Sequence, residues 1–263
     1  MMHPTSSPTP VAVVTGGARG IGLAVAQMFL AQGHRVALLD IDSDTLARTH
    51  TALNDPERVL ALHTDVSKPD QVDAAVQAVV DRFGRVDALV NNAGVAVFKP
   101  ILKTSFEEWR HVMSTNLDGA FLCTQAFAPV MLRTGGGAIV NIASISGLRA
   151  STLRVAYGTS KGALIHLTKQ QACELGNAGI RVNAIAPGPV ETEMAKAVHS
   201  TSIISDYFDA IPLNRYGTPA EIANAVGFLC SPAASYVNGQ VLAVDGGFDA
   251  SGVGLPTLRR EAK

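Results

Sequence analysis

The chain has few cysteines, and the three it has follow no recognisable pattern. Cys123, Cys173 and Cys230 are odd in number, lie far apart and lack the spacing of a metal site. A disulfide framework is therefore not expected, and no bound metal is predicted. We predict instead that all three are reduced, buried thiols in a cytoplasmic protein.

The sequence also lacks a block of like charge and a long apolar run. It has 21 lysines and arginines against 22 aspartates and glutamates, interspersed, for a net charge of −1. Such a balance argues against a nucleic acid or an anionic membrane as the main partner. No apolar run is long enough to span a membrane. Residues 1–10 are rich in proline, serine and threonine without an apolar signal core, which predicts a disordered lead-in rather than a targeting segment.

Internal repeats and linker-like segments are absent as well. What the chain does have is length and apolar content, because its 263 residues are 47% hydrophobic. That is enough to bury a large core without disulfides or metals. We therefore predict a single domain over residues 11–248 and a C-terminal tail over residues 249–263.

Short apolar runs alternate with helix-like periodic stretches along this domain. Strands are expected at residues 11–15, 35–39, 59–63, 87–90, 138–142, 181–186 and 241–244. Helices are expected up to about residue 32, and at 43–53, 69–83, 106–133 (one helix or two in sequence), 156–178 and 219–230. This alternation predicts an α/β fold with one doubly wound parallel sheet and helices on both faces. The less regular stretch 189–215 is expected to form a lid over a ligand.

A glycine turn joins the first strand to the first helix. Gly16, Gly20 and Gly22 have the spacing G-x-x-x-G-x-G, so the general fingerprint G-x-G-x-x-G is not matched. Glycines let the backbone approach a pair of phosphates, and the helix N-terminus adds partial positive charge, although tight packing alone is an alternative. Asp40 ends the second strand, where a carboxylate can bind a ribose diol and repel a 2′-phosphate. Its alternative role is that of a turn or helix-capping residue.

Tyr157 and Lys161 are four residues apart in a predicted helix, so their side chains lie one turn apart on the same face. A nearby positive charge lowers the pKa of a phenol, which is ordinarily about 10. The pair could then exchange a proton near neutral pH, although the same spacing also occurs by chance on surface helices. Asn116 lies among apolar residues inside another predicted helix, either as a functional group or as one satisfied buried amide.

Six motifs in this order resemble those of the short-chain dehydrogenase/reductase family. Residues 15–22 look like its T-G-x-x-x-G-x-G turn, residues 91–94 like its N-N-A-G motif, and Pro187, Gly188 and Thr192 like its nicotinamide-side motif. The remaining residues resemble its catalytic tetrad, and they are Asn116, Ser144, Tyr157 and Lys161. Ser144 lies 13 residues before Tyr157, as in the family, and the likeness runs from about Val11 to Phe248.

The resemblance implies a Rossmann-like sheet of about seven parallel strands and NAD(P)-dependent interconversion of alcohols and carbonyls. It implies that Tyr157 is the acid/base, that Lys161 lowers the pKa of Tyr157 and binds the nicotinamide ribose, that Ser144 holds the substrate oxygen, and that Asn116 anchors a water for proton relay. The implied cofactor contacts are Gly16, Arg19, Gly20, Ile21, Gly22, Asp40, Asp65, Val66, Asn92, Ala93, Gly94, Tyr157, Lys161, Pro187, Val190 and Thr192. Ser146 competes with Ser144 for its role, and Asp65 and Thr192 have helix capping as an alternative.

The cofactor expected on this basis is NAD. Asp40 stands where NADP-using relatives usually lack a carboxylate, and Ile41 supplies no arginine after it. Arg19 is evidence for NADP instead, because a basic residue at this position helps to hold a 2′-phosphate in some relatives. The leading hypothesis is an oxidoreductase of secondary alcohols, with a polyol or sugar derivative favoured. The alternative is a 3-ketoacyl-carrier reductase using NADPH, and a cofactor-binding protein without catalysis is disfavoured because all four catalytic residue types are present.

Two further expectations concern the surroundings of the site. The substrate pocket is expected to be walled by residues near 95–98, 145–154 and 189–213, including Arg154, whose partner the sequence does not reveal. The resemblance also implies dimers or tetramers built on the helices that carry Asn116 and Tyr157, and we predict a homotetramer. The tail near Leu255 and Pro256 is expected to reach a neighbouring subunit's site.

Overall fold

The structure is a computed structural model that describes residues 9–252 and 256–261. Within this part of the chain, seven strands form one parallel sheet in the order β3-β2-β1-β4-β5-β6-β7. The strands are β1 Val11–Thr15, β2 Arg35–Asp40, β3 Val59–His63, β4 Ala88–Asn91, β5 Gly137–Ile142, β6 Ile180–Pro187 and β7 Val241–Val244. The order reverses between β1 and β4, and open α/β sheets bind ligands at such a reversal. The predicted doubly wound fold is confirmed.

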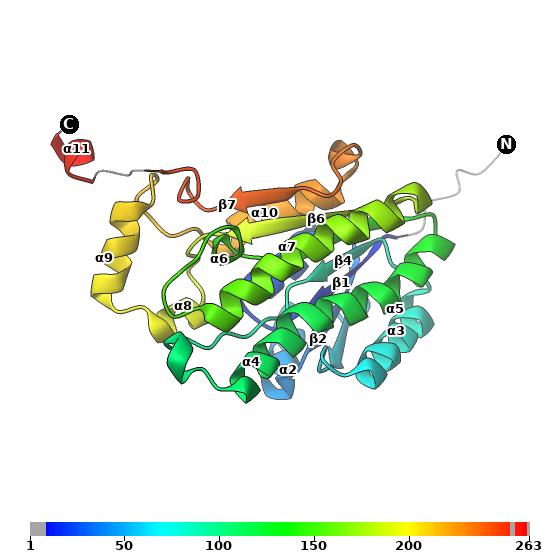
Figure 1. The fold of residues 1–263 in the computed structure, drawn as a ribbon. Helices are drawn as coiled ribbons and strands as arrows, with labels where there is room; N and C mark the ends of the chain where they lie inside the picture. The colour runs from blue at the N-terminus through cyan, green and yellow to red at the C-terminus, as the bar shows by residue number, and fades with distance from the viewer. Residues whose placement is uncertain (1–8, 253–255, 262–263) are drawn as a thin grey trace.

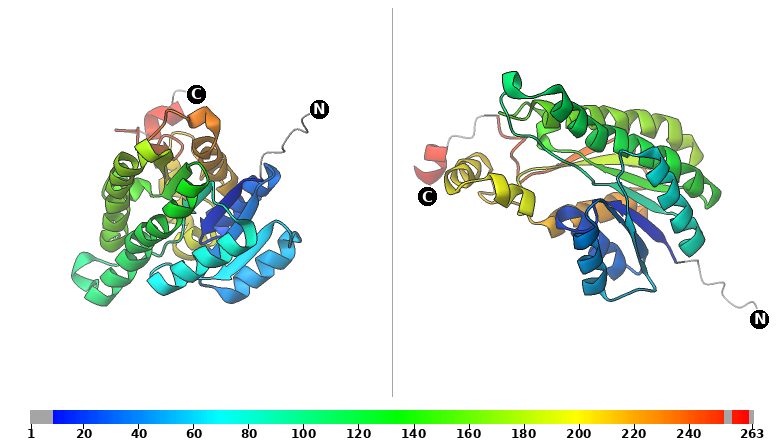
Figure 2. Two further views of the ribbon diagram at one scale, coloured as in Figure 1. Left: turned by 90° about the vertical axis from the view of Figure 1, so that its right-hand side faces the viewer. Right: turned by 90° about the horizontal axis from the view of Figure 1, so that it is seen from below.

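Helices cover both faces of this sheet (Figures 1 and 2). The α-helices are α1 Gly20–Ala31, α2 Ser43–Leu53, α3 Pro69–Phe83, α4 Phe106–Met113, α5 Gly119–Arg133, α6 Ile145–Leu148, α7 Val155–Leu175, α8 Glu193–Val198, α9 Thr201–Ala210, α10 Pro219–Cys230 and α11 Pro256–Glu261. Short 3₁₀ turns occupy Ile101–Lys103, Gly176–Ala178 and Pro232–Ala234, and Ser114–Asp118 is a π-helical stretch.

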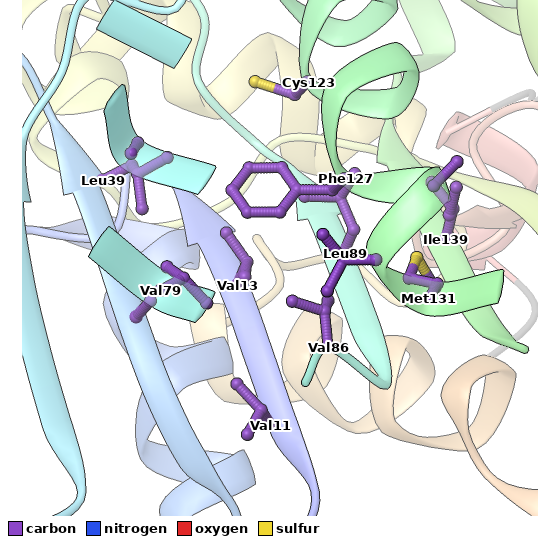
Figure 3. Packing of buried hydrophobic residues seen from close by; sticks show 14 of the residues in the cluster. Val11, Val13, Leu39, Val79, Val86, Leu89, Cys123, Phe127, Met131 and Ile139 are labelled. Carbon is purple, nitrogen blue, oxygen red and sulfur yellow. The ribbon is translucent and has the colours of Figure 1, made fainter. Parts of the chain in front are cut away.

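Alternation along the strands sends side chains into two separate cores. Val11 and Val13 of β1 belong to the core against α3 and α5, whereas Ala12 and Val14 belong to the core against α1 and α10. Phe127 of α5 is completely buried at the centre of the first core (Figure 3). Because strands buried on both faces need apolar residues at every position, β1 reads as an unbroken apolar run. Apolar packing on both faces therefore determines the position of the strands. The polar residues at the carboxyl edge of the sheet are not needed for this packing and can bind a ligand.

Predicted helix boundaries are confirmed where capping residues set them. Thr218 accepts a hydrogen bond from the backbone N–H of Glu221, and the Glu221 side chain accepts one in return from the Thr218 backbone N–H, which forms a capping box at the start of α10. Gly33 and Gly179 have φ of +83° and +85° where the chain leaves α1 and the turn after α7. This left-handed backbone suits glycine, which is therefore common where a helix ends.

Several details differ from the sequence-based predictions. The helix expected at 106–133 is α4 and α5 joined through the π-helical stretch. The less regular stretch expected at 189–215 contains α8 and α9, because Thr192 and Ser200 cap these short helices. The four-residue α6 and the terminal α11 were not predicted. The disordered lead-in was predicted for residues 1–10, of which residues 1–8 lie outside the described residues. Leu255 of the predicted tail contact lies outside them as well.

The prediction that every cysteine is buried is wrong for Cys173, which lies on the outer surface of α7. Burial raises the pKa of the thiols of Cys123 and Cys230 to about 12, so neither is a reactive thiolate. In the part of the chain that the structure describes, no group of three or more His, Cys, Asp or Glu side chains could hold a metal ion. No helix there has both the length and the apolar character required to cross a membrane.

Candidate active site

A cavity of about 630 Å³ lies at the carboxyl edge of the sheet. Residues at the ends of β2, β4, β5 and β6 form its floor, among them Asp40, Asn92, Ser144 and Pro187, while side chains from α4, α7, α8 and α9 form its walls. Its volume falls within the range of small-molecule and cofactor sites. The residues following several strands therefore converge on one ligand-sized space.

The glycine turn forms one end of this cavity. Gly16 and Gly20 have φ of +61° and +55° and both line the cavity. A Cβ on Gly22 would lie 2.1 Å from the Gly16 carbonyl oxygen, so only glycine lets α1 start this close to the turn. Gly22 is the one predicted cofactor residue that does not line the cavity. Its role is the packing that holds the turn in place.

The N-N-A-G motif locks this turn to β4. The Asn92 side-chain amide donates to the carbonyl oxygens of Thr15 and Gly16, both at 3.0 Å. The backbone N–H groups of Asn92 and Ala93 donate to the Thr15 hydroxyl oxygen, also at 3.0 Å. Asn91 instead donates to Asn141 of the neighbouring strand at 2.8 Å, away from the cavity. The motif thus combines one residue that braces the sheet with residues that brace the turn.

Asp40 holds the glycine turn from the other side. It is 7% exposed, and its two carboxylate oxygens accept hydrogen bonds from the backbone N–H groups of Ala18 and Asp42, each at 3.0 Å. Asp42, not Asp40, caps α2 by accepting from Thr45. Asp40 therefore has the turn role that was considered as its alternative. It also lines the cavity, where its carboxylate oxygens keep lone pairs that can accept further hydrogen bonds.

Arg19 also lines the cavity, but its charge is already compensated. Its guanidinium lies 3.3 Å from the Asp42 carboxylate and 3.9 Å from that of Glu193. The other predicted cofactor residues on the cavity wall are Ile21, Asp65, Val66, Gly94, Val190 and Thr192. Thr192 also fills its alternative role, since it caps α8. Asp65 accepts from the Ser67 N–H in the turn before α3 and does not cap that helix.

Ser144, Tyr157 and Lys161 meet on the cavity wall. The Ser144 hydroxyl oxygen accepts from the Ser146 N–H at 3.1 Å and starts α6, whereas the Ser146 hydroxyl contacts Ser151 and does not line the cavity. Lys161 is 3% exposed and donates from Nζ to the Ile142 carbonyl oxygen at 2.7 Å. Of the two serines, Ser144 and not Ser146 therefore faces the cavity.

The electrostatics of this trio differ from the prediction. Burial raises the pKa of Tyr157, and hydrogen bonding with Ser144 and the charge of Arg154 oppose the rise. Burial lowers the pKa of Lys161 to about 8. The predicted lowering of the Tyr157 pKa by Lys161 is not found here. The ammonium group is bound to a backbone carbonyl and lies 5.8 Å from the centre of the phenol ring, so Arg154 supplies the opposing charge instead.

Asn116 lies behind the cavity wall rather than on it. It is 1% exposed, and its amide accepts from the Val95 N–H at 2.8 Å and donates to the Val95 carbonyl and the Ser160 hydroxyl. A Cβ on Gly94 would lie 3.3 Å from the Asn116 Oδ1 and 3.5 Å from the Lys161 Nζ. Its contacts are those of a satisfied buried amide. Its placement, in a π-helical stretch next to the lysine, is one that often marks a functional site.

The far end of the cavity gathers side chains that are distant in the sequence. Arg154, His199 and Tyr207 were predicted wall residues and do line it. Tyr216 was missed; it does not line the cavity itself but contacts His199, with its hydroxyl 2.9 Å from the His199 Nδ1. His111 and Thr115 also line the cavity and were missed. They lie one helical turn apart, just before Asn116, so extending the face of that helix would have found these two, while no local pattern marks Tyr216.

Comparisons with known proteins match nearly the whole chain. A family model described as enoyl-(acyl carrier protein) reductase matches residues 16–249. The 2-(R)-hydroxypropyl-CoM dehydrogenase of Xanthobacter autotrophicus is 42% identical, over 91% of this chain and 98% of that protein. The L-tagatose-forming galactitol 2-dehydrogenase of Cereibacter sphaeroides is 42% identical, over 90% of this chain and 94% of that protein. The 3-oxoacyl-[acyl-carrier-protein] reductase of Chlamydia muridarum is 40% identical, over 90% and 96% respectively.

Proposed function

The chain belongs to the short-chain dehydrogenase/reductase family, and on that premise we propose that it uses NAD to interconvert a secondary alcohol and its ketone, with a polyol or sugar derivative as the favoured substrate. Membership makes it an oxidoreductase that acts on CH–OH groups with a nicotinamide cofactor. The choice of NAD, the substrate class and the role of each residue are the proposal. The observation that carries it is the meeting of Ser144, Tyr157 and Lys161 in a cavity whose other end is the glycine turn with Asp40.

The chain's own residues fit a dinucleotide in this cavity. The turn leaves no room for a Cβ on Gly16 or Gly22, so its backbone can lie against a pyrophosphate at the start of α1. Asp40 keeps lone pairs for a ribose diol. Gly94 lies beside Lys161, where the absence of a side chain leaves space for a second ribose. When bound, the nicotinamide accepts or returns the hydride, which is the part of the reaction that protein side chains do not perform.

The proton chemistry falls to the residues of the cavity wall. In the oxidation direction the Tyr157 phenolate takes the hydroxyl proton of the substrate, and Ser144 donates a hydrogen bond to the same oxygen. Arg154 favours the phenolate by its charge. Lys161, whose pKa is lowered to about 8, can exchange a proton near neutral pH. Asn116 is proposed to hold the water that connects Lys161 with solvent, on the strength of its place beside Gly94.

NAD is favoured over NADP by the charges around the adenosine end. Asp40 is buried at the end of β2, Asp42 follows it, and Arg19 is already paired with Asp42 and Glu193. A 2′-phosphate would face these carboxylates, and Arg19 would have to leave its two partners to bind it. The second candidate, a 3-ketoacyl-carrier reductase using NADPH, is favoured by the relative from Chlamydia muridarum. The same charges and the near-zero net charge count against that reading.

Replacing Tyr157 with phenylalanine tests the proposal. Steady-state oxidation of a polyol and secondary-alcohol panel, followed by NADH absorbance, should fall by about 10² to 10⁴ because the acid/base is lost. Binding of NADH, measured by its fluorescence, should persist. Tyr236→Phe is the matched control, because Tyr236 is fully exposed. Full activity in Tyr157→Phe would refute the assignment, and turnover of ketoacyl thioesters alone, with NADPH, would establish the second candidate.

A homotetramer is part of the proposal. Half-exposed large apolar side chains lie on two separate surfaces, with Phe121 and Leu132 on α5 and with Phe228 on α10 and Leu242 on β7. Two self-complementary surfaces are what a tetramer with two kinds of twofold interface requires. A monomer mass in light scattering would contradict this assembly.

A further inference from the structure

Arg154 is a cation on the cavity wall, and none of the described residues is its anionic partner. Its guanidinium donates to the Tyr207 hydroxyl oxygen at 3.2 Å and to the Thr152 carbonyl oxygen at 3.3 Å, and it lies 5.0 Å from the centre of the Phe98 ring. Among the described residues it forms no ion pair. Arg19, Arg149 and Arg215, by contrast, each lie against a carboxylate, of Asp42, Asp249 and Glu221 respectively. Arg154 thus differs from these three arginines in having no carboxylate beside it in the part of the chain that the structure describes.

The surroundings of Arg154 do not compensate its charge. The aspartates and glutamate on the cavity wall, Asp40, Asp65 and Glu193, belong to the glycine-turn end, where Glu193 lies near Arg19. Apart from the Thr152 carbonyl, Arg154 contacts aromatic side chains, and its charge acts on Tyr157, His199 and Tyr216 together. Burial and Arg154 lower the pKa of His199, so this histidine is neutral at pH 7. The substrate end of the described cavity is therefore positive, with no carboxylate of its own.

The backbone holds Arg154 in a defined place beside Tyr157. Arg154 precedes α7 directly, three residues before Tyr157, so both side chains project from the same end of that helix. Leu153, just before it, has φ of +62°, and its carbonyl oxygen accepts from the Lys99 N–H at 3.1 Å. A non-glycine residue with such a backbone is uncommon and persists only where its surroundings enforce it. The contacts of Leu153 therefore hold the backbone before Arg154, and α7 holds the backbone after it.

We propose that Arg154 is an anion subsite, and that the substrate is a secondary alcohol or ketone that also carries a carboxylate, sulfonate or phosphate. This inference rests on the proposed function, because Tyr157 and Ser144 must hold the reacting oxygen while Arg154 holds the anion. Arg154 has five N–H donors in a planar fork that suits such oxyanions, and its two hydrogen bonds leave donors for them. Tyr207 accepts from Arg154, so its own O–H is available to donate to the same anion.

Matched substrate pairs test this subsite. The probes are 3-hydroxybutyrate, 2-hydroxypropanesulfonate and 2-hydroxypropyl phosphate, each compared with neutral 2-pentanol, together with gluconate compared with sorbitol. The wild-type enzyme should prefer the anionic member of at least one pair in kcat/KM, and the three anions identify which oxyanion is recognised. Arg154→Gln should lower the anionic-to-neutral ratio for that pair by about 10- to 100-fold, the value of a charge-assisted hydrogen bond. Arg149→Gln is the matched control, because Arg149 lies in the same loop but does not line the cavity.

Binding without turnover separates this inference from the proposed function. In the Tyr157→Phe background, calorimetric titration of the NADH complex with the same anions should show binding that Arg154→Gln weakens about 10- to 100-fold and Arg154→Lys weakens less. This result supports the subsite even if no alcohol is oxidised. Equal losses on anionic and neutral members, or no anion binding in the Arg154-containing protein at millimolar concentrations, would overturn it. An unchanged ratio in Arg154→Gln would do the same.

Discussion

The two ends of the cavity are built in different ways. At the glycine-turn end, backbone groups and short side chains interlock, since Asn92 holds the turn through two hydrogen bonds at 3.0 Å and Asp40 through one, from the Ala18 N–H at 3.0 Å. At the substrate end, long side chains from α7, α8, α9 and the segment after α9 meet through ring contacts and single hydrogen bonds, as in the pair His199 and Tyr216. The first end is a rigid cradle, and the second is a collection of adjustable side chains.

This difference suits the two ends to binding different kinds of molecule. A cradle of backbone groups recognises a molecule that is the same in every reaction cycle, and it tolerates little change. Side chains on loops and short helices can be exchanged one at a time without disturbing the sheet. If the proposed function holds, this arrangement separates a constant partner, the nicotinamide cofactor, from a substrate whose identity depends on a few residues such as Arg154 and Tyr207. Substitutions in the glycine turn should therefore lower stability, whereas substitutions at the substrate end should change substrate preference.

Adding one methyl group to the cradle should have the largest effect. Gly22→Ala places a Cβ 2.1 Å from the Gly16 carbonyl oxygen, so the turn or α1 must move. We expect the free energy of unfolding to fall by roughly 3 kcal/mol, together with loss of NADH binding. Gly33→Ala is the control: its Cβ would meet nothing within 4 Å, and only its φ of +83° costs about 1 kcal/mol. Urea unfolding measures both, and equal stability of the two variants would show that the cradle is not rigid.

Removing the carboxylate of Asp40 should change cofactor preference more than stability. Asp40→Ala deletes the charge expected to repel a 2′-phosphate, so the ratio of kcat/KM for NAD over NADP should fall by about 10- to 100-fold. Some stability should also be lost, since the N–H groups of Ala18 and Asp42 lose their acceptor. Asp44→Ala, in the first turn of α2, keeps the ratio and serves as control. An unchanged ratio in Asp40→Ala would remove Asp40 as the selector.

The same contrast explains which parts of the molecule the sequence could reveal. The sheet, its order of elements and the cradle follow from features that are local in the chain, such as the apolar run of β1 and the glycines at 16, 20 and 22. Ser144 was separable from Ser146 only in three dimensions, where the first lines the cavity. Tyr216 and His199 meet across 17 residues without a motif, and Cys173 could be seen as exposed only once the orientation of α7 was known. Long-range packing, rather than local pattern, decides these positions.

The smallest expected effect is a displacement of the pH profile, and it tests whether the two ends are linked through charge. Arg154 lowers the pKa of Tyr157 against the effect of burial, so removing the charge in Arg154→Gln should raise that pKa. Oxidation needs the phenolate, and its rate rises as the pH passes the pKa. The rising limb of kcat for a neutral alcohol should therefore move to higher pH in the variant, while reduction, which needs the phenol, should persist to higher pH. Arg149→Gln, whose guanidinium lies over Phe248 and near Asp249, should leave both limbs in place. Coinciding profiles for wild type and Arg154→Gln would mean that Arg154 acts on substrate binding alone, and that the substrate end does not tune the acid/base.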